Sequence, residues 1–298
     1  MKTKNTLSII LHTYYRYECL QTVLELLSSQ TLKPLEIIIS DQTPINDRPP
    51  NFYKQFKELP LRIINIDKPM HAPAQNKGAK ISKGAILLFL DDDTEFGKDL
   101  LEQHIKVMEE ERVDVVLGVT SEEPKLPEHY KRNTGWLDPI SLFLKSPHSR
   151  WNGMALHIHG LNTSIKREVF LKIGGFDEKI PRMADIDLGY RLFRNGAKIF
   201  HSEKPFVYHK RWKKGGTRKT QHNISYTRLV SKFYLYKKHF PGWGTYQFFL
   251  LESLNAVFFR AQMRGTFQPR SMKNPILPFI RLYRIFKALI EADKLLKS

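Results

Sequence analysis

The chain contains a single cysteine, Cys19, among its 298 residues. One cysteine excludes an internal disulfide and a cysteine-rich metal site, and it fits a reducing compartment. Long apolar runs are also missing, because the longest stretch without Asp, Glu, Lys or Arg is the 15 residues 151–165. A membrane-spanning helix needs about 17–25 mostly apolar residues, so we expect no transmembrane segment. The first residues lack the apolar core and cleavage site of a secretion signal, so we expect a cytoplasmic protein.

Acidic side chains are scarce in the last third of the chain. Residues 204–298 carry 20 basic and 3 acidic side chains, whereas residues 1–203 carry 28 basic and 27 acidic ones. Nearly all of the formal net charge of +18 therefore lies after residue 203. A field of this strength attracts an anionic partner such as a phospholipid surface, nucleic acid or a phosphorylated ligand. The Trp, Phe, Tyr and Leu residues in the same third argue against a simple solvated tail.

Short apolar runs alternate with helical patterns through the first 120 residues. The predicted strands are 7–11, 35–40, 61–66, 85–90 and 113–119, and the predicted helices are 18–29, 74–83 and 99–111. This alternation predicts an α/β domain with a mainly parallel sheet covered by helices on both faces. No Gly-x-Gly-x-x-Gly follows the first strand, which argues against a dinucleotide-binding site.

The strands are predicted to stop at about residue 210, and three helices follow, at 221–239, 246–264 and 276–296. On the last helix Arg281, Arg284 and Lys287 share one arc, and apolar side chains occupy the opposite arc. A basic amphipathic helix is typical of a membrane surface. It is equally typical of a helix that packs its apolar arc against its own protein, and the two interpretations are compatible.

Three consecutive carboxylates, Asp91, Asp92 and Asp93, follow the fourth predicted strand. Neighbouring carboxylates raise one another's pKa, and a divalent cation relieves this repulsion, with Mg²⁺ or Mn²⁺ preferring oxygen ligands. Asp91 and Asp93 point to the same side of an extended segment, so one can bind a metal and the other a sugar hydroxyl. Such a metal also takes phosphate oxygens, which indicates a nucleoside diphosphate or triphosphate. The alternative is a loop in which Asp93 or Thr94 caps the next segment.

Asp41, Asp185 and His209 are the other candidate site residues. Asp41 ends the second strand, where it either accepts a hydrogen bond from a nucleobase or serves as an ordinary turn residue. Asp185 opens a predicted helix, as a helix cap or as a general base for an attacking hydroxyl. His209 ends a short strand, as a metal ligand or as an ordinary hydrogen-bonded side chain. The basic loop around Gly215 and Gly216 either closes over a diphosphate or is merely solvated.

The order and spacing of these features resembles family-2 glycosyltransferases with the GT-A fold. The matching segments are 7–16, 36–41, 76–78, 90–94, 160–167, 174–178 and 185–188, so the resemblance covers about residues 5–210. It implies a GT-A catalytic domain over residues 1–215, with a nucleotide-binding half over about 1–115 and an acceptor half over 116–215. Residues 216–298 would form a helical, basic, membrane-associated extension.

The resemblance implies an inverting transferase that moves a sugar from a nucleotide-diphosphate donor to a hydroxyl of a saccharide or lipid-linked saccharide. The residues that would bind the nucleotide sugar are Thr13, Arg16, Asp41, Asn76, Asp91 and Asp92. Asp93 and His209 would bind Mn²⁺ or Mg²⁺, and Asp185 would be the catalytic base. The basic extension is then expected to bind an anionic membrane surface, as in a peripheral membrane protein, and nucleic acid is not an expected partner.

The chain departs from the family pattern at Tyr15, Gln75 and Ala184, where the family often has Asn, Arg and Glu. Gln75 removes a cationic contact to the nucleotide, and Ala184 removes an acid beside the base. Neither change removes Asp93 or Asp185, so we expect an active enzyme with altered donor and acceptor contacts. Two alternatives stay open: a nucleotidyltransferase, which would need a Gly-rich basic loop after the first strand, and a catalytically impaired protein that binds membrane or nucleic acid.

Overall fold

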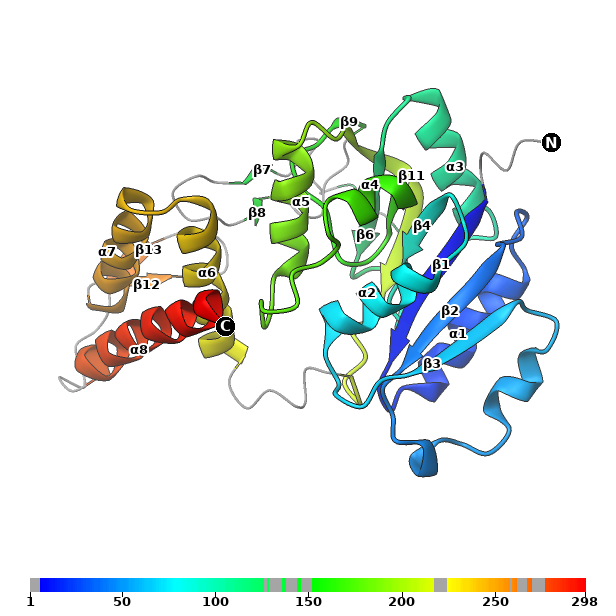
Figure 1. Cartoon of the computed structure of the whole chain (residues 1–298), viewed down its shortest axis with the longest axis horizontal. Coiled ribbons are helices and arrows are strands. Elements are labelled where there is room, and N and C mark those ends of the chain that lie inside the picture. The colour runs from blue at the N-terminus through cyan, green and yellow to red at the C-terminus, as the bar shows by residue number, and fades with distance from the viewer. Residues whose placement is uncertain are drawn as a thin grey trace. The chain divides into compact units, whose positions relative to one another are not determined.

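The structure, a computed structural model, describes residues 6–125, 128, 136–137, 144–145, 152–216, 224–257, 259–261, 267–269 and 277–298. The chain divides into two compact units (Figure 1). The first unit comprises residues 1–137, 144–177 and 184–220, and the second comprises residues 138–143, 178–183 and 221–298. Within the predicted acceptor half, residues 126–127, 129–135, 138–143 and 146–151 lie outside the described residues.

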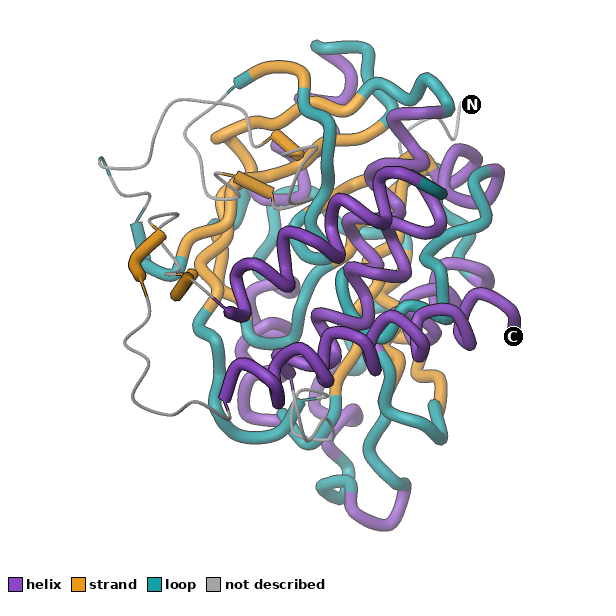
Figure 2. The backbone as a smooth tube through the Cα atoms, turned by 90° about the vertical axis from the view of Figure 1, so that its left-hand side faces the viewer, coloured by secondary structure: helices purple, strands orange, loops and turns teal. Residues whose placement is uncertain are grey.

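The first unit contains both strands and helices, which Figure 2 colours separately. Its strands are β1 (Leu7–Thr13), β2 (Glu36–Asp41), β3 (Leu61–Asn65), β4 (Ile86–Phe89), β5 (Thr94–Phe96), β6 (Val115–Ser121), β7 (Trp136–Leu137), β8 (Leu144–Lys145), β9 (Gly153–Met154), β10 (Thr163–Lys166) and β11 (Ile199–His209). Its helices are α1 (Tyr17–Ser28), α2 (His71–Ile81), α3 (Leu100–Glu110), α4 (Arg167–Lys172) and α5 (Ala184–Arg194), with 3-10 turns at Ile45–Asp47 and Phe52–Phe56.

One large sheet organises this unit, with strand order β3-β2-β1-β4-β10-β6-β11-β5 and β9 paired to β11. β1 is parallel to β2 and β4, β2 is parallel to β3, and β6 is parallel to β11. β10 runs antiparallel between β4 and β6. The predicted mainly parallel α/β sheet is therefore confirmed. The chain runs outward from β1 to β3 and returns on the other side of β1 as β4, which creates a switch point where ligands typically bind.

Alternate side chains of the central strands pack into two separate hydrophobic cores, one on each face of the sheet. Ile9, Ile37 and Leu88 belong to one cluster together with buried residues of α1 and α3. The intervening residues face the opposite side of the sheet, where α2 approaches so closely that a Cβ on Gly78 would lie 3.0 Å from Ile10 Cγ2. Burial on both faces explains why these strands read as continuous apolar runs.

The second unit consists of α6 (Ile224–His239), α7 (Trp243–Val257) and α8 (Leu277–Lys297), with the short antiparallel pair β12 (Phe259–Ala261) and β13 (Phe267–Pro269). The prediction of one helix over 246–264, with no strands after residue 210, is therefore wrong beyond Val257. The hairpin depends on pairing between Phe259 and Pro269. A helical pattern of apolar residues carries no information about a strand partner ten residues away.

Helix α8 has two apolar sides. Ile285, Ala288 and Ala292 are buried at 0–4% exposure, among the helices of the second unit. On the outer side Phe279 and Tyr283 are 72% and 65% exposed. The helix thus packs one apolar face and leaves an aromatic stripe in contact with solvent. Among the described residues, no helix is both long enough and apolar enough to cross a bilayer.

Candidate active site

The three carboxylates lie at the switch point of the sheet. Ile10 of β1 is in register with Phe89 of β4, so the residues that follow each strand emerge side by side at the same edge. Asp92 and Asp93 are buried at 3% and 2% exposure. The Thr94 hydroxyl donates to the carbonyl oxygen of Asp91 at 2.8 Å and closes the turn that carries the three acids.

Asp93 is the most heavily contacted of the three acids. One of its oxygens lies 3.1 Å from His209 Nε2, and the other accepts a hydrogen bond from the backbone N–H of Trp212 at 3.0 Å. Arg16 Nη1 lies 2.9 Å from the second oxygen. Burial acts to raise the pKa of Asp93, but His209 and Arg16 hold it below its ordinary value. The two residues that the sequence analysis named as metal ligands are therefore neighbours.

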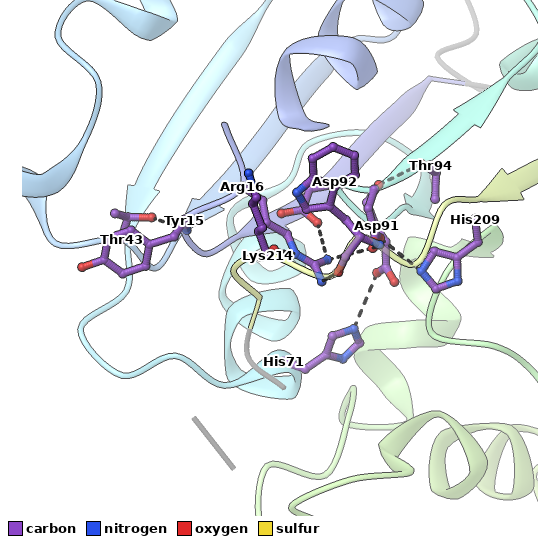
Figure 3. A network of polar contacts seen from close by, with 11 residues as sticks. Tyr15, Arg16, Thr43, His71, Asp91, Asp92, Thr94, His209 and Lys214 are labelled. Atoms are coloured by element: carbon purple, nitrogen blue, oxygen red, sulfur yellow. Dashed lines mark hydrogen bonds and ion pairs between the residues drawn. The ribbon is translucent and has the colours of Figure 1, made fainter. Parts of the chain in front are cut away.

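Arg16 joins the acids to the basic loop that follows β11 (Figure 3). Its guanidinium also contacts Asp92 at 3.1 Å and donates to the carbonyl oxygens of Trp212 and Lys214 at 2.9 and 3.2 Å. Gly216 adopts a φ of +76°, and a Cβ there would lie 2.6 Å from Arg16 Cζ, so a larger residue does not fit. The loop is thereby folded over Arg16 and Asp93.

Asp92 is held in a different state from its neighbours. Burial raises its pKa to about 7, and Arg16 opposes that rise only in part. Thr13, fully buried at the end of β1, also lies beside this carboxyl group and favours its charged form. Arg16 is therefore the charged side chain that contacts the carboxyl group of Asp92.

Asp91, Asp93 and His209 can hold a metal ion. Each offers one ligand atom, and the three atoms all lie within 4.8 Å of one another. Asp91 Oδ1 is buried and has no hydrogen-bond partner, although buried carboxylate oxygens are normally paired. Two carboxylates and one imidazole form a donor set that suits a divalent first-row cation. The residues present therefore fit the metal that the sequence analysis expected.

Asp185 lies in the first turn of α5, where two backbone groups hold its carboxylate. Oδ1 accepts from the N–H of Ile186 at 3.0 Å, and Oδ2 accepts from the N–H of Gly160 at 3.3 Å. A Cβ on Gly160 would lie 3.8 Å from Asp185 Cβ and 3.1 Å from His71 Cε1. His71 in turn reaches Asp91, with 3.8 Å between Nε2 and Oδ1. His71 therefore lies between the Gly160 segment that holds Asp185 and the acidic cluster.

Burial raises the pKa of Asp185 above its ordinary value, while His71 and the two backbone N–H groups oppose that rise. A carboxyl group whose pKa is raised is a better proton acceptor at neutral pH than an ordinary aspartate. Asp185 is the second residue of α5 and accepts from the N–H of the next residue, whereas a helix-capping aspartate precedes the helix and accepts from an N–H two or three residues on, so its contacts are not those of a cap.

Asn76 and Asp41 do not join the acidic cluster directly. Asn76 exchanges two hydrogen bonds with the backbone of Phe176, at 2.8 and 2.9 Å. Asp41 is fully buried, and its Oδ2 accepts from the hydroxyls of Tyr17 and Tyr53 at 2.8 and 2.7 Å. Arg48 lies 3.2 Å from the same oxygen. In this structure Asn76 fixes a loop, and Asp41 organises a cluster of tyrosines beside β2.

Gln75 and Ala184 are both buried. Gln75 Nε2 donates to the carbonyl oxygen of Gly160 at 3.1 Å, so it supports the segment that holds Asp185. Ala184 is 7% exposed and immediately precedes that base candidate.

The sequence analysis missed His12 and His71. Their rings contact edge to face, with centroids 4.4 Å apart, and both lie beside Asp91. His12 has a sequence signal, because it comes directly before Thr13 at the carboxyl end of a predicted strand. His71 has none, because its approach to Asp91 depends on how α2 packs against the sheet.

A family model described as Glycosyl transferase family 2 matches residues 8–174. The uncharacterized glycosyltransferase YwdF of Bacillus subtilis is 36% identical over 104 residues, 35% of this chain and 38% of that protein. An uncharacterized glycosyltransferase of Haemophilus influenzae is 29% identical over 191 residues, 63% of this chain and 62% of that protein. A glucosyl-dolichyl phosphate glucuronosyltransferase of Haloferax volcanii is 24% identical over 219 residues, 68% of either protein. The chain thus spans between 38% and 68% of the length of these relatives.

Solved structures show the same fold. The crystal structure of GalNAc-T7 with UDP, GalNAc and Mn²⁺ superposes with a TM-score of 0.66 at 15% identity, over 86% of this chain and 51% of that chain. S. aureus TarS 1–349 superposes with a TM-score of 0.58 at 15% identity, over 97% of this chain and 83% of that chain. The expected GT-A fold is therefore confirmed. Neither the nucleotidyltransferase nor the catalytically impaired protein is favoured by these matches.

Proposed function

Because this chain belongs to glycosyl transferase family 2, we propose that it transfers a sugar from a nucleoside-diphosphate donor to a hydroxyl of a saccharide or lipid-linked saccharide, with inversion at the anomeric carbon. One observation carries the proposal. Asp91, Asp93 and His209 offer ligand atoms within 4.8 Å of one another, and His71 links this group to Asp185. A metal-binding group and a base of raised pKa are the two parts that such a transfer requires.

Asp93 and His209 would hold a divalent cation, Mn²⁺ or Mg²⁺, and Asp91 would contribute to the same group. When bound, the cation neutralises the diphosphate and makes it a better leaving group. Arg16 lies against Asp92 and Asp93 and adds a fixed positive charge at the place where the diphosphate oxygens are received. Asp41, Asn76 and Thr13 support the nucleoside side of the site, Asn76 by holding a loop in place.

Asp185 receives the proton of the acceptor hydroxyl while that oxygen attacks the anomeric carbon. The backbone N–H groups of Gly160 and Ile186 fix the orientation of the carboxylate, and burial makes it more basic. Attack from the face opposite the departing diphosphate gives a product of inverted configuration. Holding both substrates in one site supplies much of the acceleration.

The second unit binds an anionic membrane surface beside a lipid-linked acceptor. All three acidic side chains of residues 204–298 contact α6: Lys232 lies 3.6 Å from Glu252, Tyr226 donates to Glu291 at 2.8 Å, and Lys237 pairs with Asp293. Each acid is thus paired with a side chain of the same unit, while Lys287, Lys294 and Lys297 of α8 are exposed.

A ligand screen tests the donor, the metal and the base together. Thermal shifts of the purified protein are measured with a panel of nucleotide sugars, with and without Mn²⁺. We expect a donor that stabilises the protein only when the cation is present. With that donor, Asp185→Asn should retain the thermal shift and lose transfer by at least about 100-fold, because only the proton acceptor is removed.

Two comparisons make the result decisive. Asp93→Ala should lose the Mn²⁺-dependent part of the shift, and Asp99→Asn, an acid at the start of α3 outside the site, should behave as wild type. Substantial turnover by Asp185→Asn would remove that residue from its role. No stabilising nucleotide sugar in the whole panel would count against the transferase assignment itself.

A further inference from the structure

Two histidines and an aspartate come together beside the acidic cluster, each from a different element. His12 is in β1, His71 is the first residue of α2, and Asp91 follows β4. Their ligand atoms all lie within 4.8 Å of one another, as do those of the Asp91, Asp93 and His209 group. The two groups share only Asp91. His71 and His209 approach it from different sides (Figure 3).

Two buried polar atoms of this group have no hydrogen-bond partner. His12 Nδ1 and Asp91 Oδ1 are both buried without a hydrogen bond. His71 Nε2 is 3.8 Å from Asp91 Oδ1, which is beyond hydrogen-bond distance. Arg16 forms ion pairs with Asp92 and Asp93, whereas Asp91 is paired with His71. Buried polar atoms normally have hydrogen-bond partners, so His12 Nδ1 and Asp91 Oδ1, which have none, are candidate ligand atoms.

From this geometry we infer that His12, His71 and Asp91 form a second divalent-cation site, which shares the Asp91 carboxylate with the Asp93–His209 group and prefers an imidazole-binding ion such as Zn²⁺. Two imidazoles and one carboxylate are three protein ligands that leave one position open, a common arrangement for zinc. Zn–N bonds of about 2.0–2.1 Å place tetrahedral ligand atoms roughly 3.4 Å apart. Side-chain rotations that move the ligand atoms by about 1 Å would therefore bring all three to bonding distance from one ion.

The surroundings hold this group in place. Phe176 packs against His71 with ring centroids 6.4 Å apart, and Asn76 fixes the backbone of Phe176 through two hydrogen bonds. His12 is anchored by β1, which pairs with strands on both sides. A bridging carboxylate such as Asp91 can hold two cations about 3.5–4 Å apart. The two sites can thus be filled together.

Metal titration without nucleotide or acceptor tests this inference. Full-length protein is stripped with a chelator and titrated with Zn²⁺ by calorimetry, and with Co²⁺ by visible absorption, which reports ligands around the ion. We expect two ions per chain. His71→Ala should bind one ion, because one ligand of the second site is removed. The side chain removed is at a helix start and is 38% exposed, so the fold tolerates its loss. His209→Ala should also bind one ion, and the double variant none.

Matched variants separate a specific site from surface binding. His239→Ala, at the end of α6, should still bind two ions. His71→Cys keeps a zinc ligand and should restore the second ion, with a new near-ultraviolet band for thiolate bound to Co²⁺. His12→Ala should match His71→Ala, and thermal melts in chelator confirm that each variant is folded.

Two outcomes overturn the inference. One is a wild-type stoichiometry of one ion that His209→Ala abolishes, which leaves only the Asp93–His209 group as a metal site. The other is an unchanged stoichiometry and Co²⁺ spectrum in both His71→Ala and His12→Ala. Because the probe is the metal alone, either result is independent of whether the chain transfers a sugar.

Discussion

His104 is buried in α3, and its ring makes hydrogen bonds with Ser164 of β10 and with Asn162, which immediately precedes that strand. Nε2 lies 2.9 Å from Asn162 Oδ1, and Nδ1 lies 3.0 Å from the Ser164 hydroxyl. Asn162 Nδ2 donates to two backbone carbonyls, so Asn162 Oδ1 is the acceptor, and His104 carries its proton on Nε2. Burial lowers the pKa of His104 to about 4, which keeps the ring neutral at physiological pH.

This histidine should make stability depend on pH. In the unfolded chain a histidine has a pKa of about 6.5, so the unfolded state binds more protons than the folded state between pH 6.5 and about 4. Stability is therefore lost as the pH falls through that window, by on the order of 3 kcal/mol. Urea unfolding of wild type and His104→Gln at several pH values between 4 and 7 measures the difference, and we expect a flatter profile for the variant.

His239→Gln is the control, because it changes a histidine of α6 that makes neither of these two contacts. It should reproduce the wild-type profile. If His104→Gln loses as much stability as wild type between pH 6.5 and 4, the titrating group is another side chain.

For single residues, the sequence shows which side chains have suitable chemistry, but it does not show which residues those side chains contact. Asp93 and His209 are predictable as a pair from the resemblance to family-2 glycosyltransferases, and both are types that bind metals. Asn76 belongs to a matching motif, yet its amide is hydrogen-bonded to Phe176, which is 100 residues away in sequence. His71 has no pattern around it at all. These contacts arise from packing of α2 on the sheet, and local sequence does not encode that packing.

At the scale of elements, helix α5 and the loop 173–176 support each other. Asp187 and Arg191 are four residues apart, a spacing that predicts a pair on one helix face, and Arg191 Nε lies 2.7 Å from Asp187 Oδ2. The same guanidinium donates to the carbonyl oxygens of Ile173 and Gly175 at 2.7 and 2.6 Å. The first contact can be predicted from spacing, and the other two cannot, because they join segments separated by a loop.

Arg191→Lys should destabilise the protein by about 2–3 kcal/mol. A lysine retains the charge but cannot hold Asp187 and two carbonyl oxygens at once with a single ammonium group. Chemical unfolding measures the cost. Arg194→Lys, an exposed position on the same helix, should change stability by less than about 0.5 kcal/mol. Equal stabilities for the two variants would contradict a supporting role for Arg191.

Asn76 holds the same loop from the other side, through the backbone of Phe176. Two residues that fix one short segment should not contribute independently. In a double-mutant cycle, Asn76→Ala combined with Arg191→Lys should therefore deviate from the sum of the single changes by roughly 0.5 kcal/mol or more. Strict additivity would mean that each residue acts on its own surroundings only.

At the scale of the whole molecule, the alternation of strands and helices predicted the first unit well, because burial on both sheet faces imposes apolar runs that sequence shows directly. The second unit was predicted less well. Its three helices follow from periodicity, but the β12–β13 pair needs a distant partner. Helix α8 also departs from simple amphipathicity, since Ile285 packs inward while Phe286 is 55% exposed. One apolar side of α8 is buried within its own unit, and the other is free to contact a second apolar environment.

A lipid surface is the environment that this composition suits. The exposed stripe of α8 includes Phe279, Tyr283, Phe286 and Ile290, spaced three or four residues apart, and Trp243 and Tyr246 of α7 are 75% and 69% exposed. Aromatic side chains insert at the headgroup boundary, and each nearby Lys or Arg adds about 1 kcal/mol on an anionic membrane. Both contributions come from the same unit, so they should act together.

Vesicle sedimentation tests this arrangement. Full-length protein should bind vesicles that contain acidic phospholipid, bind neutral vesicles weakly, and lose affinity as salt screens the charge. Phe279→Ser with Phe286→Ser should reduce binding by at least about tenfold, because two aromatic anchors are removed while the net charge is kept. Phe193→Ser, which removes a 46%-exposed phenylalanine from α5 of the first unit, should bind as wild type. Loss of binding in all variants would indicate a general surface effect. Equal binding by wild type and the double variant would mean that charge alone attaches the protein to the membrane, without the aromatic side chains of α8.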